Sequence, residues 1–262
     1  NLLNAIYFAS LRRITMNKTV IIIPSRLNAQ RLPNKPLKLI NNKPMITHVY
    51  DAALRSQTGQ VYVASPDQEI IDLIIKQGGN AIKTSENHET GTDRIFEVFK
   101  KELKEQPSVI INLQGDMPNI DPLAIKHLAS YMHKKKCDIA TLASNIENNT
   151  ELNNTNVVKV KVKEKLSKKI FLEATDFFRV NSGQNLNLYH HVGIYAFTND
   201  ALIRYVGLKR SKLELERKLE QLRALENNMS IHVGYISTSP VSVDTEEDLN
   251  QVKKLIEEND KT

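Results

Sequence analysis

Three cations, Arg26, Arg31 and Lys35, stand on a short proline-containing segment between Ile23 and Leu37, directly after an apolar run that predicts a strand. Arginine can bind phosphate oxygens as a two-pronged fork and lysine as a point charge, so the three could hold a polyphosphate. The segment has neither the Walker pattern G-x-x-x-x-G-K-[ST] nor the Rossmann pattern G-x-G-x-x-G. An ordinary solvated basic loop is the alternative, and charge alone favours that alternative.

Two aspartates could hold a magnesium ion. Asp116 follows Gly115 at the end of an apolar run, where a buried strand would stop. Because Mg²⁺ prefers one or two carboxylates together with phosphate oxygens and water, a second aspartate from elsewhere would complete the site. Asp244, between Val243 and Thr245, is the candidate. A turn or helix-capping role explains Asp244 at least as well.

Other catalytic and metal-binding patterns are missing from the sequence. His190 and His191 are adjacent, so on a strand they would point to opposite faces and could not form a local metal pair. His88 is more typical of a loop histidine than of a ligand. With neither an H-E-x-x-H motif nor a nucleophile elbow, the sequence offers no support for covalent serine or cysteine catalysis.

The elements that must position these residues alternate between strands and helices. The spacing predicts strands over 20–23, 61–64, 109–113 and 139–142. It predicts helices over 45–54 and 68–76, a helix from the cap Thr92 to about residue 104, and one opened by Pro122. Such alternation predicts an α/β fold with a mainly parallel sheet flanked by helices.

A smaller β-rich subregion is expected over about 145–235, beginning with the Asn-rich stretch 145–156. A strand over 191–197, a helix over 213–226 and a strand over 231–236 are expected, and Thr245 with Asp248 forms a capping box for a last helix. Lysines alternate with valines from Val158 to Lys163. Protection of an edge strand explains this pattern better than nucleic-acid binding does.

Composition narrows the class of protein. The chain has 262 residues, 40% of them hydrophobic, a formal net charge of +6 and one cysteine, Cys137. Neither an intramolecular disulfide nor a cysteine zinc cage can form, which favours a reducing, cytoplasmic location. Dispersed charge and the absence of tryptophan argue against nucleic-acid binding, and no apolar run has the ~20 residues of a membrane helix. Residues 1–15 are expected to be an extension outside the fold, with Met16 as the natural start and 16–262 as one domain.

Several separated motifs follow one another between Val20 and about Leu255. They are Ile-Pro-Ser-Arg at 23–26 with Arg-Leu-Pro-Asn-Lys-Pro-Leu at 31–37, Gly-Thr-Asp-Arg at 91–94, Leu-Gln-Gly-Asp at 113–116, His-Val-Gly-Ile-Tyr at 191–195, Leu-Glu-Gln-Leu-Arg-Ala-Leu-Glu at 219–226 and Val-Asp-Thr at 243–245. In order and spacing they resemble the motifs of the 3-deoxy-manno-octulosonate cytidylyltransferase family. Sialate cytidylyltransferases, which share the fold, are less similar.

The resemblance implies a nucleotide-diphospho-sugar transferase-like fold, a homodimer and Mg²⁺-dependent transfer of the cytidylyl group from CTP to the octulosonate, for lipopolysaccharide precursor synthesis. The sugar's anomeric hydroxyl would attack the α-phosphorus, and pyrophosphate would leave in line. The implied roles are triphosphate binding for Arg26, Arg31 and Lys35, metal binding for Asp116 and Asp244, a place at the nucleotide and sugar site for Arg94, and sugar contacts for Gln114, His191, Tyr195 and Gln221, with Arg26, Lys35 and Asp116 as the catalytic set.

The chain departs from the family pattern at Ala29, Pro66, Leu172, Glu173 and Arg217. Leu172 and Glu173 replace a Ser-Arg pair beside the expected sugar site, where a carboxylate would repel a sugar acid and weaken its binding. Two alternatives follow from the departures. One is a catalytically decayed relative that binds a nucleotide, and the other is a cytidylyltransferase for a related sugar acid.

Overall fold

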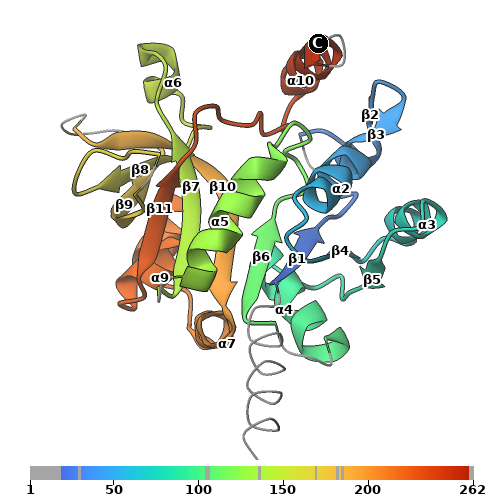
Figure 1. The fold of residues 1–262 in the computed structure, drawn as a ribbon, viewed down its shortest axis with the longest axis horizontal. Coiled ribbons are helices and arrows are strands. Elements are labelled where there is room, and N and C mark those ends of the chain that lie inside the picture. The colour runs from blue at the N-terminus through green and yellow to red at the C-terminus, as the bar shows by residue number, and fades with distance from the viewer. Residues whose placement is uncertain are drawn as a thin grey trace, which may run out of the picture.

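The computed structural model describes residues 19–28, 31–103, 107–134, 137–168, 170–180, 183 and 186–259. The expected extension 1–15, Met16 and Ala29 lie outside the described residues. Within these ranges, nine strands form one sheet (Figure 1). Their order is β5 (Ala81–Lys83), β4 (Gln60–Ser65), β1 (Thr19–Pro24), β6 (Val109–Leu113), β10 (Leu188–Thr198), β7 (Ile139–Ser144), β11 (Ile231–Tyr235), β9 (Leu172–Phe178) and β8 (Lys159–Val162).

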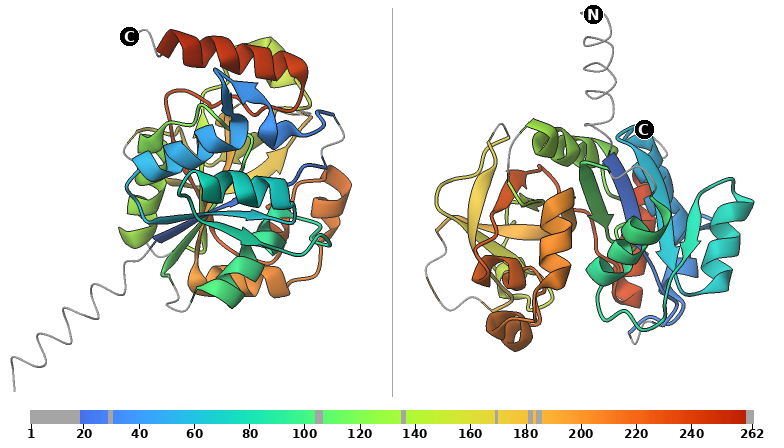
Figure 2. Two further views of the ribbon diagram at one scale, coloured as in Figure 1. Left: turned by 90° about the vertical axis from the view of Figure 1, so that its right-hand side faces the viewer. Right: turned by 90° about the horizontal axis from the view of Figure 1, so that it is seen from below.

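The first four strands of this order are all parallel, as the alternation of strands and helices predicts. Side chains of β1 alternate between two apolar clusters, because successive residues of a strand face opposite sides. Ile21 and Ile23 pack with α2 (Met45–Arg55), α3 (Gln68–Lys76) and α5 (Pro122–Lys134). Val20 and Ile22 pack with α4 (Gly91–Glu102) and α7 (Asn199–Gly207). The left-hand view of Figure 2 accordingly shows α2 and α4 on opposite sides of these strands.

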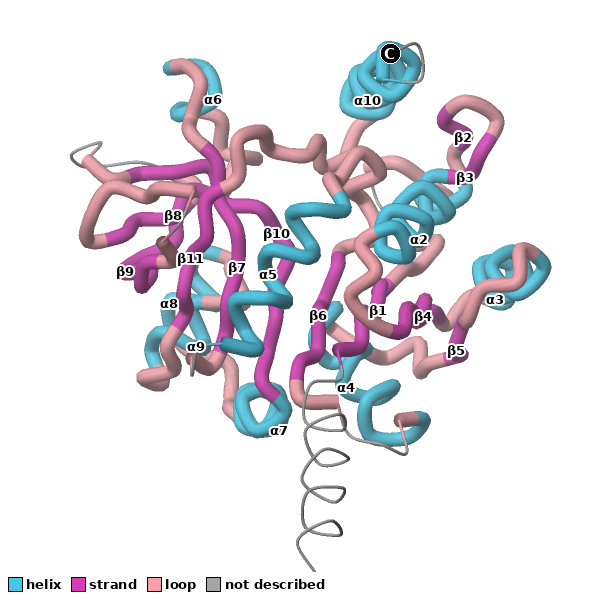
Figure 3. The backbone as a smooth tube through the Cα atoms, viewed as in Figure 1, coloured by secondary structure: helices cyan, strands magenta, loops and turns pink. Residues whose placement is uncertain are grey.

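The other half of the sheet is largely antiparallel. Strand β10 runs antiparallel to β6, β7 and β8, and β9 runs antiparallel to β8 and β11, whereas β7 and β11 are parallel. Because β8 pairs with both β9 and β10, the strands β10, β7, β11, β9 and β8 form a closed ring of pairings. Figure 3 shows these strands gathered on the side of the molecule away from α3. The α/β fold is confirmed.

The edge-strand interpretation of the lysine-valine alternation is wrong. Both edges of β8 are used in pairing, so this strand has no open edge for lysines to protect. Val160 and Val162 are buried and Lys161 is exposed, as alternation predicts, but Lys159 is buried as well.

Three helices differ from their predictions. The cap of α4 is Thr90, whose hydroxyl accepts from the amide of Asp93 at 3.1 Å, while Thr92 lies inside the helix. The expected helix 213–226 is broken into α8 (Lys212–Arg217) and α9 (Leu222–Glu226), because Lys218 between them is left-handed with φ 54°. The helix α7 was not predicted. By contrast, the Thr245–Asp248 capping box that opens α10 (Glu246–Asn259) is confirmed.

The remaining elements are short. They are the 3-10 helix η1 (Lys35–Leu37), the hairpin of β2 (Leu39–Ile40) and β3 (Lys43–Pro44), and α6 (Asn149–Asn153). No helix among the described residues combines the length and the apolar character needed to cross a membrane.

Candidate active site

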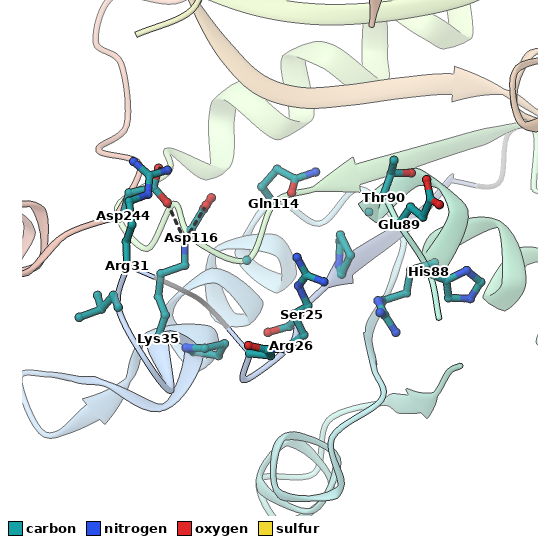
Figure 4. Close-up of a pocket in the computed structure, with 17 residues that line it drawn as sticks. Ser25, Arg26, Arg31, Lys35, His88, Glu89, Thr90, Gln114, Asp116 and Asp244 are labelled. Atoms are coloured by element: carbon teal, nitrogen blue, oxygen red, sulfur yellow. Dashed lines mark hydrogen bonds and ion pairs between the residues drawn. The ribbon is translucent and has the colours of Figure 1, made fainter. Parts of the chain in front are cut away.

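A cavity of about 700 Å³ opens where β1 and β6 end, and it brings the predicted charged residues together. In Figure 4, the two aspartates lie at one end with Arg31 and Lys35, and His88 with Glu89 lies at the other. The carboxyl end of such strands is where ligands bind in open α/β sheets. Seven predicted site residues line the cavity: Arg26, Arg31, Lys35, Arg94, Gln114, Asp116 and Asp244.

Lys35 is the centre of this arrangement. Its Nζ donates to Asp116 Oδ2 at 3.1 Å, to Asp244 Oδ1 at 3.1 Å and to the carbonyl of Val243 at 2.8 Å. Arg31 Nη2 contacts the other oxygen of Asp244 at 2.9 Å. Burial lowers the pKa of Lys35, but the two aspartates more than offset this effect, so its pKa lies above the usual value. Lys35 therefore stays protonated at neutral pH.

The two aspartates reach this point from distant parts of the chain. Gly115 allows the turn before Asp116, since a Cβ at that position would lie 3.2 Å from the carbonyl oxygen of Pro24 and from Ile46. The amide of Val243 donates to the carbonyl of Asp116 at 2.9 Å, which fixes the two segments side by side. Asp248 holds the Asp244 backbone by accepting from its amide at 2.9 Å.

This pair of carboxylates fits a magnesium ion. Two hard oxygen donors already surround one cation, the Lys35 ammonium, so the charge and donor type suit a divalent ion. In the part of the chain that the structure describes, no cluster of three or more His, Cys, Asp or Glu side chains could hold a metal. A two-carboxylate site agrees with the preference of Mg²⁺ for substrate phosphates and water as its other ligands.

Arg94 faces the same cavity but is itself buried, at 3% exposed. It donates to the hydroxyl of Thr84 and to the carbonyl of Ser85, the latter at 2.9 Å. Burial and the nearby Arg26 lower the pKa of Arg94. The guanidinium thus fixes the loop after β5, which carries His88 into the cavity wall.

A second cavity of about 330 Å³ adjoins the first, and Arg31, Gly91, Gln114, Asp116 and Asp244 line both cavities. Like Gln114, the remaining residues that were predicted to contact a sugar acid line the second cavity. They are His191, Tyr195 and Gln221. The structure thus brings all ten predicted site residues to two adjoining spaces.

Two of these predicted side chains, His191 and Tyr195, are buried and neutral. His191 Nε2 lies 2.9 Å from the hydroxyl of Thr141. Burial, with a smaller contribution from His190, lowers the pKa of His191 to about 3, so the ring is uncharged at neutral pH. Burial and the nearby Glu220 raise the pKa of the Tyr195 phenol well above its usual value. These side chains therefore act as hydrogen-bonding groups rather than as ions.

Comparison with known proteins agrees with this geometry. Residues 20–231 match the family model described as Cytidylyltransferase. The chain is 42% identical over 241 residues to the 3-deoxy-manno-octulosonate cytidylyltransferase of Brucella anthropi, covering 91% of this chain and 96% of that protein. It is 38% identical to the enzyme of the same name from Paramagnetospirillum magneticum, covering 90% and 97%. The chain belongs to the 3-deoxy-manno-octulosonate cytidylyltransferase family.

Solved structures support the same assignment. A CMP:2-keto-3-deoxy-manno-octonic acid synthetase complexed with CTP superposes with a TM-score of 0.83 at 35% identity, covering 92% of this chain and 99% of that chain. The 4-diphosphocytidyl-2C-methyl-D-erythritol synthase of Anaerococcus prevotii has a TM-score of 0.60 at 13% identity, which shows a shared fold alone. As a member of this family, the protein is a nucleotidyltransferase.

Several residues of the second cavity were not predicted. Arg179 follows β9, and its Nη1 donates to the carbonyls of Thr155 and Asn156 at 3.2 Å each. His190, Lys218 and Glu220 also line this cavity. Glu220 stands next to the predicted Gln221 in the Leu-Glu-Gln motif, so that motif could have indicated it. No motif singles out Arg179, because only the pairing of β8 with β9 brings it to the cavity.

The interpretation of Leu172 and Glu173 as neighbours of the sugar site is wrong. Both residues are described, and neither lines a cavity with the predicted site residues. The side chain of Glu173 is 53% exposed and forms an ion pair with Lys163 at 3.7 Å. Strand β9 pairs with β11 at this point, which turns Glu173 to solvent and removes any reason for repulsion of a sugar acid.

Two other departures have local partners. Arg217 Nη1 forms an ion pair with Asp176 at 2.7 Å and donates to the carbonyl of Phe177 at 3.0 Å. After Pro66, the carboxylate of Asp67 accepts from the amide of Leu27 at 2.8 Å. Asp67 therefore braces the start of the cation-bearing loop.

Proposed function

We propose that the protein transfers the cytidylyl group of CTP to 3-deoxy-manno-octulosonate and releases pyrophosphate. One observation carries this proposal: a cavity lined by cations adjoins a second cavity in which neutral hydrogen-bonding groups form part of the wall, and the two meet at Gln114, Asp116 and Asp244. A nucleoside triphosphate and a sugar acid in adjoining spaces would bring the α-phosphorus and the attacking hydroxyl together. The two relatives are named as octulosonate cytidylyltransferases, which favours the same pair of substrates.

The cations of the first cavity would bind the triphosphate. Arg26 and Arg31 are exposed on the cavity wall and free to fork onto phosphate oxygens, Arg31 by exchanging its contact with Asp244. Lys35 would turn from its two aspartates toward a phosphate group as a point charge. Catalysis of this reaction is largely positioning and charge stabilisation, which suits such residues.

Asp116 and Asp244 would hold Mg²⁺, which the fit of the two carboxylates supports. A bound Mg²⁺ neutralises phosphate charge as it develops on the leaving pyrophosphate. On the sugar side, Gln114, His191, Tyr195 and Gln221 would orient the sugar acid through hydrogen bonds. Arg94 would act by fixing the loop after β5 against the nucleotide.

Pyrophosphate release tests the proposal. The purified protein is incubated with CTP, 3-deoxy-manno-octulosonate and MgCl₂, with pyrophosphate and the CMP-sugar quantified together. We expect the two products in equal amounts, and neither when the sugar acid is omitted or EDTA is added. Nucleotide binding without turnover would favour a decayed relative. Turnover with another sugar acid alone would favour the related-substrate alternative.

Three further features remain predictions: a role in lipopolysaccharide precursor synthesis, a cytoplasmic location and a homodimer. The first follows from the proposed product, and the homodimer follows from the family resemblance. Light scattering coupled to size-exclusion chromatography checks the assembly, because a dimer would have twice the 29.8 kDa mass of the chain.

A further inference from the structure

Lys159 is a buried cation with no assigned role. It lies on β8 and is 0% exposed. Its Nζ donates to the carbonyl of Asn154 at 2.6 Å and to the carbonyl of Arg179 at 2.8 Å. Among the described residues, no carboxylate forms an ion pair with Lys159. A buried ammonium costs free energy unless its surroundings compensate it, and here its hydrogen-bond acceptors are two carbonyl oxygens, with Glu151 near enough to act on the charge.

These two hydrogen bonds tie together the wall of the second cavity. Lys159 links the segment before β8 to the backbone of Arg179, and Arg179 Nη1 returns to the carbonyls of Thr155 and Asn156. Arg179 and Asn156 both line the cavity. The Lys159 ammonium therefore fixes the position of the Arg179 backbone, while the Arg179 guanidinium fixes residues 155–156.

Charges of both signs line the second cavity: Arg31, Arg179 and Lys218 are cationic, and Asp116, Glu220 and Asp244 are acidic. Burial lowers the pKa of Lys159, the nearby Arg179 lowers it further, and Glu151 raises it. Glu151 is already in contact with the ring of His190, which also lines the cavity. The charged groups that act on Lys159 are therefore Arg179 and Glu151, and Glu151 has a partner of its own. Buried positive charge of this kind raises the potential inside a neighbouring cavity and attracts an anion.

We propose that Lys159 is a positioning residue for a carboxylate subsite, holding Arg179 and the 154–156 segment so that this wall receives the carboxylate of the sugar acid. The inference rests on the proposed function and names the part of the substrate that this wall recognises. The neutral groups His191, Tyr195 and Gln221 would then contact the hydroxyls.

The test compares Lys159→Met with Lys161→Met, since Lys161 lies on the same strand but is exposed. Each protein is assayed with 3-deoxy-manno-octulosonate and with its carboxamide, in which a neutral amide replaces the carboxylate. For Lys159→Met we expect the KM of the sugar acid to rise about tenfold, because Arg179 and the 154–156 segment would no longer be held in place for a charge-assisted contact. We expect the KM for CTP and the kcat to stay within about twofold, and Lys161→Met to resemble the wild type.

The preference for carboxylate over carboxamide is the deciding readout. A merely structural role for Lys159 would weaken both sugar analogues equally, whereas the proposed role removes the preference. Lys159→Arg, which keeps the charge, should restore part of it. An unchanged preference in folded Lys159→Met would overturn the inference. If that variant does not fold, Arg179→Met takes its place, with the same expected loss of preference and the same outcome against it.

A failure of the proposed function gives a different result. If the wild type does not turn over the sugar acid, calorimetric Kd values for the two analogues replace KM. Equal affinity of the wild-type protein for carboxylate and carboxamide would then overturn the subsite. Tighter binding of the carboxylate, lost in Lys159→Met, would support the subsite although the proposed reaction had failed.

Discussion

The parallel half of the sheet holds its candidate site residues on loops at strand ends, whereas the antiparallel half holds several of them on strands. In the first cavity, Arg26 and Arg31 are exposed, and Lys35 is anchored by ion pairs. In the second, His191 and Tyr195 lie on β10 and are at most 8% exposed. Figure 1 shows β10 beside β6, where the two halves meet.

The difference agrees with the two ligands proposed for the cavities. A polyphosphate carries several charges that change partners during transfer, so cations at the cavity wall that can exchange partners suit it. A sugar has many hydroxyls in fixed positions, so it needs neutral donors and acceptors held rigidly by packing. Substitutions in the first region should therefore change catalysis, and substitutions in the second should change specificity or stability.

The largest effect is expected at the two aspartates. Asp116→Asn or Asp244→Asn should lower kcat by about 100-fold or more, because a neutral amide holds Mg²⁺ poorly and leaves phosphate charge uncompensated. Steady-state rates across a range of MgCl₂ concentrations measure the effect, with Asp72→Asn on the exposed face of α3 as control. Near-normal rates at ordinary magnesium concentrations would contradict the metal assignment.

Lys35→Ala should have the next largest effect. Loss of an ammonium that contacts phosphate typically costs ~2 kcal/mol, so kcat/KM for CTP should fall about 30-fold. The two aspartates would also lose their shared cation. Initial rates at varied CTP give the value, and Lys76→Ala, at an exposed position of α3, is the matched control. A decrease smaller than about threefold would argue against a phosphate contact.

His191 in the second region should affect stability in acid. The folded state holds the pKa of His191 at about 3, below its usual value, so on acidification the unfolded chain takes up a proton that the folded chain does not. This term therefore lowers stability as the pH falls from about 6.5 toward 3. In His191→Gln, the loss of unfolding free energy between pH 7.5 and 5.5 should be about 1 kcal/mol smaller. Urea unfolding at both pH values checks it, and equal losses in the two proteins would refute it.

The smallest effect is expected at β9. Changing Leu172→Ser together with Glu173→Arg should leave the KM for the sugar acid within about twofold, because Glu173 faces solvent and its ion pair with Lys163 is exposed. Rates at varied sugar acid measure it. A KM lowered more than about threefold would mean that β9 contributes to the sugar site after all.

Local sequence predicted many of the elements. The strand β1 and the helix α3 lie where they were expected, because the spacing of apolar residues indicates whether one or both faces of an element are buried. The Thr245–Asp248 box was also predictable, since its two hydrogen bonds join residues three apart. The break between α8 and α9 at Lys218 could not be predicted, because a glycine usually marks a left-handed backbone and this position is a lysine.

For the site, the residue types and the strand ends at which they stand could be read from the sequence alone. The cation loop after β1 and the aspartate after β6 follow from their strands, and the family motifs added His191, Tyr195 and Gln221. Tertiary structure decided which distant segments meet. The Val243 amide bound to the carbonyl of Asp116 sets the two aspartates around Lys35.

The same limit explains Glu173 and Lys159. Their side-chain types were visible, but a strand's neighbours decide whether a charge is buried or exposed. Glu173 faces solvent where β9 pairs with β11, whereas the pairing of β8 with both β9 and β10 encloses Lys159. Strand pairing over long sequence separations depends on the packing of the whole sheet, which no short run of residues encodes.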